Sequence, residues 1–212
     1  MADNNEIMET KTVEANVALT GIADNSPVGT FVFVILCIAF WAADLGMLGE
    51  GTQLGLGLLS FGVFVTYVAT GVALTLKGVG VGGNTYHLFG AVFGAIGGLF
   101  NTFGPIFAHL GIPFEGRIAG IAFTLAGLYL LCMLPGVARF TKVDFFIFFF
   151  GFLGVTGSGL VIIGALPPAF NIFNGWALFF DGVVGFYSVI ATVLSFCGVI
   201  LPLGQPFIKA KA

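Results

Sequence analysis

Six apolar segments, each long enough to cross a lipid bilayer, constrain this chain more than any other feature of its sequence. They cover approximately residues 28–49, 53–76, 85–108, 116–138, 143–166 and 176–200. A helix that crosses the hydrocarbon core needs about 20 apolar residues. The stretch FFIFFFGFLGV, residues 145–155, is apolar throughout, whereas strands of a membrane barrel alternate apolar and polar residues. The sequence therefore predicts an all-α, polytopic membrane protein with six transmembrane helices.

The few charged residues support this prediction and divide the chain into parts. Only 8% of the 212 residues are charged and 58% are hydrophobic, too few charges for the surface of a soluble domain. Residues 1–24 are acidic and polar without an apolar core, so we expect a flexible cytoplasmic tail there. Residues 25–204 would form the transmembrane domain, and residues 205–212 a short cytoplasmic C-terminal tail.

The lysines and arginines predict the direction of the spans. With the N-terminus inside, the cytoplasmic segments carry six of them: Lys11, Lys77, Arg139, Lys142, Lys209 and Lys211. The outer loops carry only Arg117. Positive residues concentrate in cytoplasmic loops, so we expect both termini in the cytoplasm. The protein would then be integral to the inner, cytoplasmic membrane.

Residues that could support catalysis or hold a cofactor are scarce. The two histidines, His87 and His109, are predicted on opposite membrane faces, which argues against a metal site or a catalytic triad. Gly78, Gly80 and Gly83 fit G-x-G-x-x-G, but the acidic residue that a dinucleotide loop needs about 20 positions later is missing. We therefore predict no enzyme, no cofactor and no metal. Without a basic cluster, we also expect no nucleic-acid partner.

Three predicted helix starts share the expected cytoplasmic face. Asn25 and Pro27 precede the first span, Asn84 and Thr85 the third, and Thr141 the fifth. A helix start exposes unpaired N–H groups and partial positive charge, which suits a small anion. Ordinary capping of the helices explains the same residues.

Acidic residues inside the spans are informative because burying a charge in hydrocarbon is costly. Asp181 is predicted about six residues into the sixth span, near its outer end, and is a candidate for the conduction path or for proton coupling. It could instead pair with Arg117 or be wetted from outside. Asp44 is expected at the membrane interface, and Asp144 is expected to complement the dipole of the fifth helix.

Several short motifs follow one another in an order typical of one family. NSPVGTFVF, residues 25–33, is similar to N-P-A-P-L-G-L-x-x-F. GNTY, residues 83–86, resembles G-N-T-F, and LPLG, residues 201–204, resembles L-P-I-G. Tyr187 lies six residues before a Val-Leu pair. On these motifs, which span residues 25–204, the chain resembles the acetate uptake transporter family, also called the succinate–acetate permease family.

The resemblance implies a homohexamer with one pathway through each protomer for small monocarboxylates such as acetate, sometimes succinate. It also implies a narrow hydrophobic constriction built from the first, third and fifth spans. The first position falls on Phe33 and the second on Phe93 or Gly94. The third falls on Phe150, Gly151 or Leu153. Departures from the family pattern at residues 42–44 and 195–196 leave substrate range and proton coupling open.

We therefore predict a transporter or channel for small monocarboxylates, with acetate as the leading candidate substrate. Two alternatives are a channel for small neutral solutes such as urea or ammonia and a membrane scaffold without transport. The expected partners are the small carboxylate, protons in the case of symport, and the lipid bilayer. The candidate substrate-binding residues are Asn25, Pro27, Phe33, Asn84, Thr85, Phe93, Phe150, Leu153, Asp181 and Tyr187.

Overall fold

The computed structural model describes residues 25–208 and folds them into helices, with no strand among these residues. The helices are α2 (Ser26–Asp44), α3 (Thr52–Leu76), α4 (Gly80–Phe89), η1 (Gly90–Ile96), α5 (Gly97–His109), α6 (Arg117–Val137), α7 (Lys142–Ile162), η2 (Pro168–Phe170) and α8 (Asn171–Phe196). Six helical stretches are long and apolar enough to cross a membrane. The prediction of six spans is therefore confirmed. The predicted tail at 1–24 and residues 209–212 lie outside the described residues.

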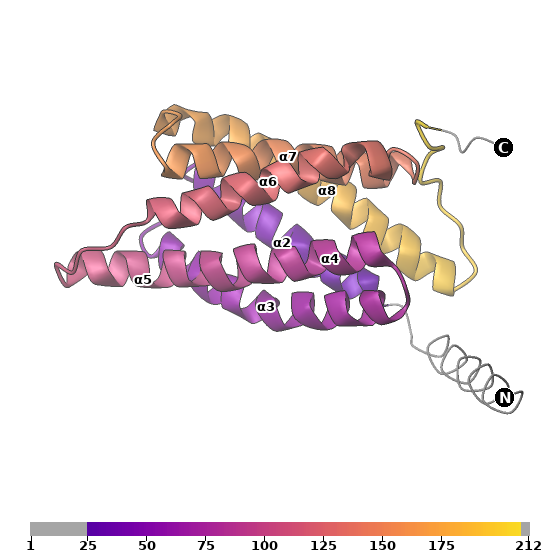
Figure 1. Cartoon of the computed structure of the whole chain (residues 1–212), viewed down its shortest axis with the longest axis horizontal. Helices are drawn as coiled ribbons and strands as arrows, with labels where there is room; N and C mark the ends of the chain where they lie inside the picture. The colour runs from indigo at the N-terminus through magenta and orange to yellow at the C-terminus, as the bar shows by residue number, and fades with distance from the viewer. Residues whose placement is uncertain (1–24, 209–212) are drawn as a thin grey trace, which may run out of the picture.

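The third span is continuous from Gly80 to His109, but its middle is π-helical. The segment η1 joins α4 to α5 without a break in the helix axis (Figure 1). A π-helical turn widens the backbone and is frequently found at functional sites. Phe93 lies in this segment.

Three predicted boundaries differ from the structure by five residues or more. The first span ends at Asp44 rather than at 49, because Gly46 takes a positive φ of 68° and turns the chain. The third span begins at Gly80 rather than at 85, since glycines 80, 82 and 83 continue as helix after the turn at Gly78 (φ 76°). The sixth span begins at Pro168 rather than at 176, because a 3₁₀ turn at Pro168–Phe170 leads directly into α8 at Asn171.

Asn25 is the N-cap of α2 and Pro27 lies in its first turn, as predicted, but only Thr141 among the predicted caps forms a side-chain cap hydrogen bond. Thr141 and Asp144 form a capping box, in which the Asp144 N–H donates to Thr141 Oγ1 at 3.1 Å and the Thr141 N–H donates to Asp144 Oδ2 at 3.2 Å. The prediction that Thr85 begins the third span is wrong, because Thr85 lies in the second turn of α4. Its hydroxyl donates to the carbonyl of Val81 at 2.8 Å.

The connections lie at the two ends of the helical bundle (Figure 1). The α3–α4 turn, the α6–α7 turn and the two ends of the described chain lie at one end, which we call the terminal end. This end carries Lys77, Arg139 and Lys142, whereas Arg117 lies at the opposite end. The arrangement matches the predicted charge asymmetry, and the side of the membrane that each end faces stays a prediction.

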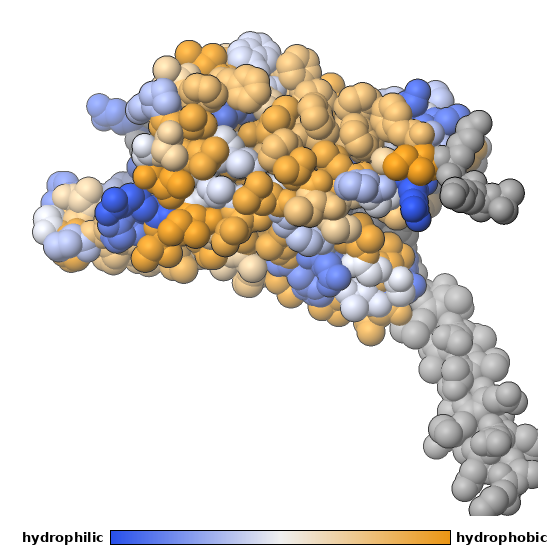
Figure 2. Space-filling model, turned by 45° about the horizontal axis from the view of Figure 1, so that its top comes forward, coloured by the Kyte–Doolittle hydropathy of each residue, from blue (hydrophilic) through white to orange (hydrophobic). Residues whose placement is uncertain are grey.

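Helix packing places α2 in the middle of the bundle. It packs along α8 on one side and against α3 on the other, while α6 and α8 pack on α7. Glycines allow close approach: a Cβ on Gly127 of α6 would lie 2.7 Å from the backbone N of Thr156 on α7. Small residues have this role in membranes because no hydrophobic effect drives one helix onto another. Hydrophobic residues cover the middle of the visible surface, and hydrophilic ones gather toward its ends (Figure 2).

Candidate functional site

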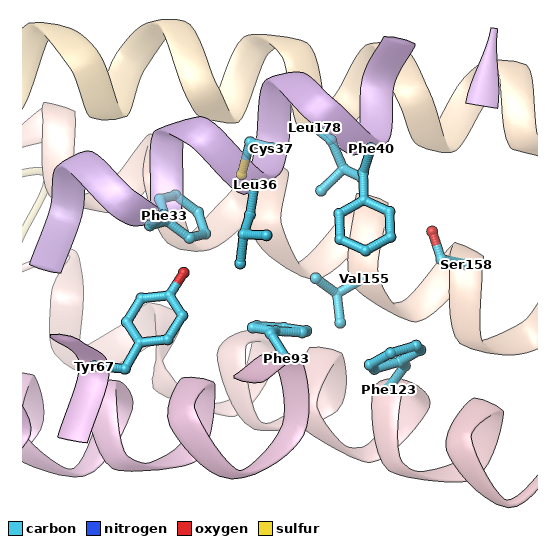
Figure 3. Close-up of a pocket in the computed structure, with 10 residues that line it drawn as sticks. All are labelled: Phe33, Leu36, Cys37, Phe40, Tyr67, Phe93, Phe123, Val155, Ser158 and Leu178. Atoms are coloured by element: carbon cyan, nitrogen blue, oxygen red, sulfur yellow. The ribbon is translucent and has the colours of Figure 1, made fainter. Parts of the chain in front are cut away.

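A small cavity lies where all six spans converge. We call it the aromatic cavity; its volume is about 50 Å³. Its lining comes from α2, α3, η1, α6, α7 and α8, as the close-up shows (Figure 3). The lining residues are Phe33, Leu36, Cys37, Phe40, Tyr67, Phe93, Phe123, Val155, Ser158 and Leu178. The third predicted transmembrane helix thus contributes through its π-helical segment.

Aromatic rings border this cavity in a connected row. The Phe33 ring stacks on Phe89 at 5.4 Å and an interplanar angle of 12°. Phe89 lies 5.1 Å from Phe93, and Phe93 lies 5.9 Å from Phe123. Ring pairs at such distances attract one another beyond their burial, so the wall is held in place by contacts among the first, third and fourth spans.

A second, larger space opens toward the terminal end, and we call it the vestibule. Its volume is about 380 Å³, and all six spans again contribute. Hydroxyl groups line it, among them Thr30 and Tyr86, whose oxygens lie 2.5 Å apart, and Thr85, which lies 3.4 Å from the Tyr129 oxygen. A solute that enters from this end therefore meets hydrogen-bonding groups before it meets the aromatic cavity.

Phe33 separates the two spaces because it lines both of them. Ser26, at the start of α2, borders the vestibule seven residues earlier, about 10 Å along the helix axis. Phe40, another seven residues on, borders the far part of the aromatic cavity. The two spaces thus follow one another along α2, with the stacked Phe33 and Phe89 rings at their junction.

Asp181 lies deeper than the sequence indicated. It is ten residues beyond the start of α8, about 15 Å along the helix, and its side chain is fully buried. Cys37 Sγ donates to Asp181 Oδ2 at 4.0 Å, and Oδ1 has no hydrogen-bond partner among the described residues. The carboxyl lies behind Cys37 and is not part of the cavity lining.

Both alternatives for Asp181 were wrong. Arg117 pairs with Glu115 at 2.6 Å, and both side chains are more than half exposed. Hydrogen bonds from the Arg117 guanidinium lower the pKa of Glu115 from 4.5 to about 2. The side chain of Asp181 has no exposed surface, so it is not a carboxylate wetted from outside.

The other candidate residues fall into three groups. Phe33 and Phe93 line the aromatic cavity, and Pro27 and Thr85 line the vestibule. Asn25 lies at the start of α2, where its buried Oδ1 has no hydrogen-bond partner among the described residues. Six candidates, Asn25 among them, lie outside both linings: Asn25, Asn84, Phe150, Leu153, Asp181 and Tyr187.

The hydroxyl of Tyr187 donates to the carbonyl of Pro202 at 2.8 Å. It therefore ties α8 to the segment that follows it. On α7, the cavity lining is formed by Val155 and Ser158 rather than by the expected Phe150 or Leu153. Phe150 instead lies 5.7 Å from Phe180 of α8.

The sequence prediction missed most of the cavity lining, and Tyr67 above all. Tyr67 lies in α3, a helix to which no site residue had been assigned, and its exposure is 0%. The sequence feature that could have identified it is a single tyrosine in the middle of an apolar span. A buried hydroxyl needs a hydrogen-bond partner, so this residue type at mid-span indicates the inside of the bundle.

Comparison with known proteins gives a match at the level of structure. No family model matches the sequence, and no curated protein matches it. One solved structure, "Structure of the bacterial acetate channel SatP", superposes on this chain with a TM-score of 0.72. The chain shares the fold of that channel. The alignment covers 86% of this chain and 99% of the channel, at 21% sequence identity.

Proposed function

We propose that this protein is a membrane channel or transporter for small monocarboxylates, acetate first, and a member of the acetate uptake transporter family. The observation that carries the proposal is the convergence of all six spans on a vestibule and an aromatic cavity in series. The shared fold with a bacterial acetate channel supports it, as do the motifs at residues 25–33, 83–86 and 201–204.

The physical task fits these two spaces. A carboxylic acid with a pKa of about 4 to 5 is almost wholly ionised at neutral pH, and its anion cannot cross hydrocarbon unaided. Hydroxyls of the vestibule would replace part of the hydration shell. The short apolar passage beyond Phe33 would then exclude solutes that keep their water.

The size of the aromatic cavity favours a very small solute. A water molecule needs roughly 10–15 Å³ of such space, so about 50 Å³ accommodates the few non-hydrogen atoms of acetate. A longer acid would have to displace a ring of the wall. Since no Lys, Arg or His is among the lining residues, an anion would be held weakly, which suits passage rather than storage.

A lining without basic residues would also suit a channel for neutral solutes such as urea or ammonia. Purified protein in liposomes separates the two functions: labelled acetate and labelled urea are offered with and without an imposed membrane voltage. We expect acetate uptake that exceeds that of protein-free liposomes and responds to voltage. Uptake of urea without uptake of acetate would contradict the proposal and support the neutral-solute channel. Uptake of neither would support a scaffold.

Proton coupling is tested in the same liposomes. A symporter accumulates labelled acetate against its gradient when an inward proton gradient is imposed, and it moves protons in a fixed ratio to acetate. A channel carries acetate current that does not depend on the proton gradient. We propose further that each protomer of a homohexamer carries its own pathway, as the family resemblance implies, with both termini in the cytoplasm.

A further inference from the structure

We propose that the hydroxyl of Tyr67 binds the carboxyl group of the solute inside the aromatic cavity. The inference rests on the proposed function and adds the group that recognises the substrate. It assigns this role to α3, which lies outside the three spans that the family resemblance implicates.

The position of Tyr67 is fixed by its surroundings. Its side chain is fully buried, and its ring lies 5.9 Å from Phe89 in an edge-on arrangement. The ring of Tyr86 lies 6.2 Å away on the vestibule side. With two aromatic neighbours, the phenol has little freedom to turn its hydroxyl elsewhere.

That hydroxyl has no hydrogen-bond partner within the described part of the chain. Buried hydroxyls are nearly always paired, because leaving one unpaired is costly. Figure 3 shows the oxygen pointing away from α3, into the space bordered by Phe33, Leu36 and Phe93. An unpaired donor that points into a cavity along the proposed pathway indicates a ligand as its partner.

The other polar groups of the lining are already occupied. The Ser158 hydroxyl donates to the carbonyl of Gly154 at 2.8 Å. The Cys37 thiol donates to Asp181 Oδ2 at 4.0 Å. Among the described lining residues, Tyr67 is thus the one with an O–H available to a solute.

The chemistry of the site selects a carboxylate. A phenol O–H donates readily to an anionic oxygen, and such charge-assisted bonds are about twice as strong as neutral ones. The aromatic and aliphatic rest of the lining suits the methyl group of acetate. The solute would enter past Phe33 with its carboxylate oxygen on Tyr67 and its methyl group against Phe93 and Val155.

The test compares Tyr67→Phe with Tyr187→Phe. Each change removes one phenolic hydroxyl, but the hydroxyl of Tyr187 bonds to Pro202 outside the cavity. Acetate binding to purified protein in nanodiscs is measured by saturation-transfer NMR of the acetate methyl group, and labelled acetate uptake is measured separately in liposomes. We expect Tyr67→Phe to weaken acetate binding about tenfold or more, the value of one hydrogen bond to a charged group.

We also expect Tyr67→Phe to keep or raise the melting temperature, because its hydroxyl has no protein partner to lose. Unchanged acetate binding in a folded Tyr67→Phe protein would overturn the inference, as would equal weakening in Tyr187→Phe. If the wild-type protein binds acetate through Tyr67 but does not transport it, the binding site stands and the proposed function fails. If the wild-type protein does not bind acetate, the inference fails.

Discussion

Replacing Phe33 by alanine should join the vestibule to the aromatic cavity and relax the selection for short acids. Phe33 lines both spaces and is only 5% exposed, so its ring forms the partition between them. In a hydrophobic pocket, each methylene that does not fit costs about 1–3 kcal/mol, or roughly 10–200-fold. Butyrate carries two methylenes more than acetate. We expect the acetate-to-butyrate uptake ratio to fall by about tenfold or more.

The assay is competitive uptake of the two labelled acids into liposomes at equal concentrations. Removing a buried phenylalanine ring costs about 3–5 kcal/mol of stability, so Phe33→Leu, which retains more of the packing, is measured alongside. Phe31→Ala is the matched control, because Phe31 lies on the same helix but is 43% exposed. An unchanged uptake ratio in folded Phe33→Ala protein would refute the partition.

Three further predictions concern packing, capping and charge. Gly127→Ala should lower the melting temperature sharply, because the added Cβ would overlap Thr156. Gly62→Ala is the control, since no atom lies within 4 Å of its Cβ, and equal melting temperatures of the two variants would contradict the prediction. Thr141→Ala should cost about 0.5–2 kcal/mol through loss of the cap of α7, and Thr141→Ser should restore it; a thermal melt that does not distinguish the two would argue against the cap. The pKa of Glu115 is depressed to about 2, so any stability it contributes is present above pH 4.5 and is lost as the pH falls toward 2. The difference in melting temperature between the wild type and Glu115→Gln should stay constant above pH 4.5 and shrink as the pH falls toward 2; a difference that already changes above pH 4.5 would count against the depressed pKa.

The number and type of helices were predictable because a bilayer requires long apolar runs and this sequence has six of them. Helix ends were less predictable. The sixth span was expected to begin at 176, yet Asn174 already lies in α8 and its side chain is fully buried in the bundle. A polar residue inside a membrane protein can face other helices rather than water, so polarity alone does not mark an end.

The candidate site was predictable only in part, and the reason is physical. In a soluble helix, the apolar face indicates the core, but helices in lipid are apolar on all sides. The apolar run of α3 therefore did not reveal that Tyr67 faces inward while Val65, two residues away, is 69% exposed. Phe33 and Phe93 were found through family resemblance. On α7, the resemblance indicated Phe150 or Leu153, whereas the cavity lining contains Val155.

The central claim is that a small carboxylate passes through the middle of one protomer. Acetate uptake by Val155→Trp protein tests it most directly, because Val155 is buried in the wall of a cavity of about 50 Å³ that an indole ring would fill. Val65→Trp is the control, since Val65 is exposed on the outside of α3. We predict that Val155→Trp, folded and inserted, loses acetate uptake while Val65→Trp keeps it. Wild-type uptake by Val155→Trp protein would place the route elsewhere.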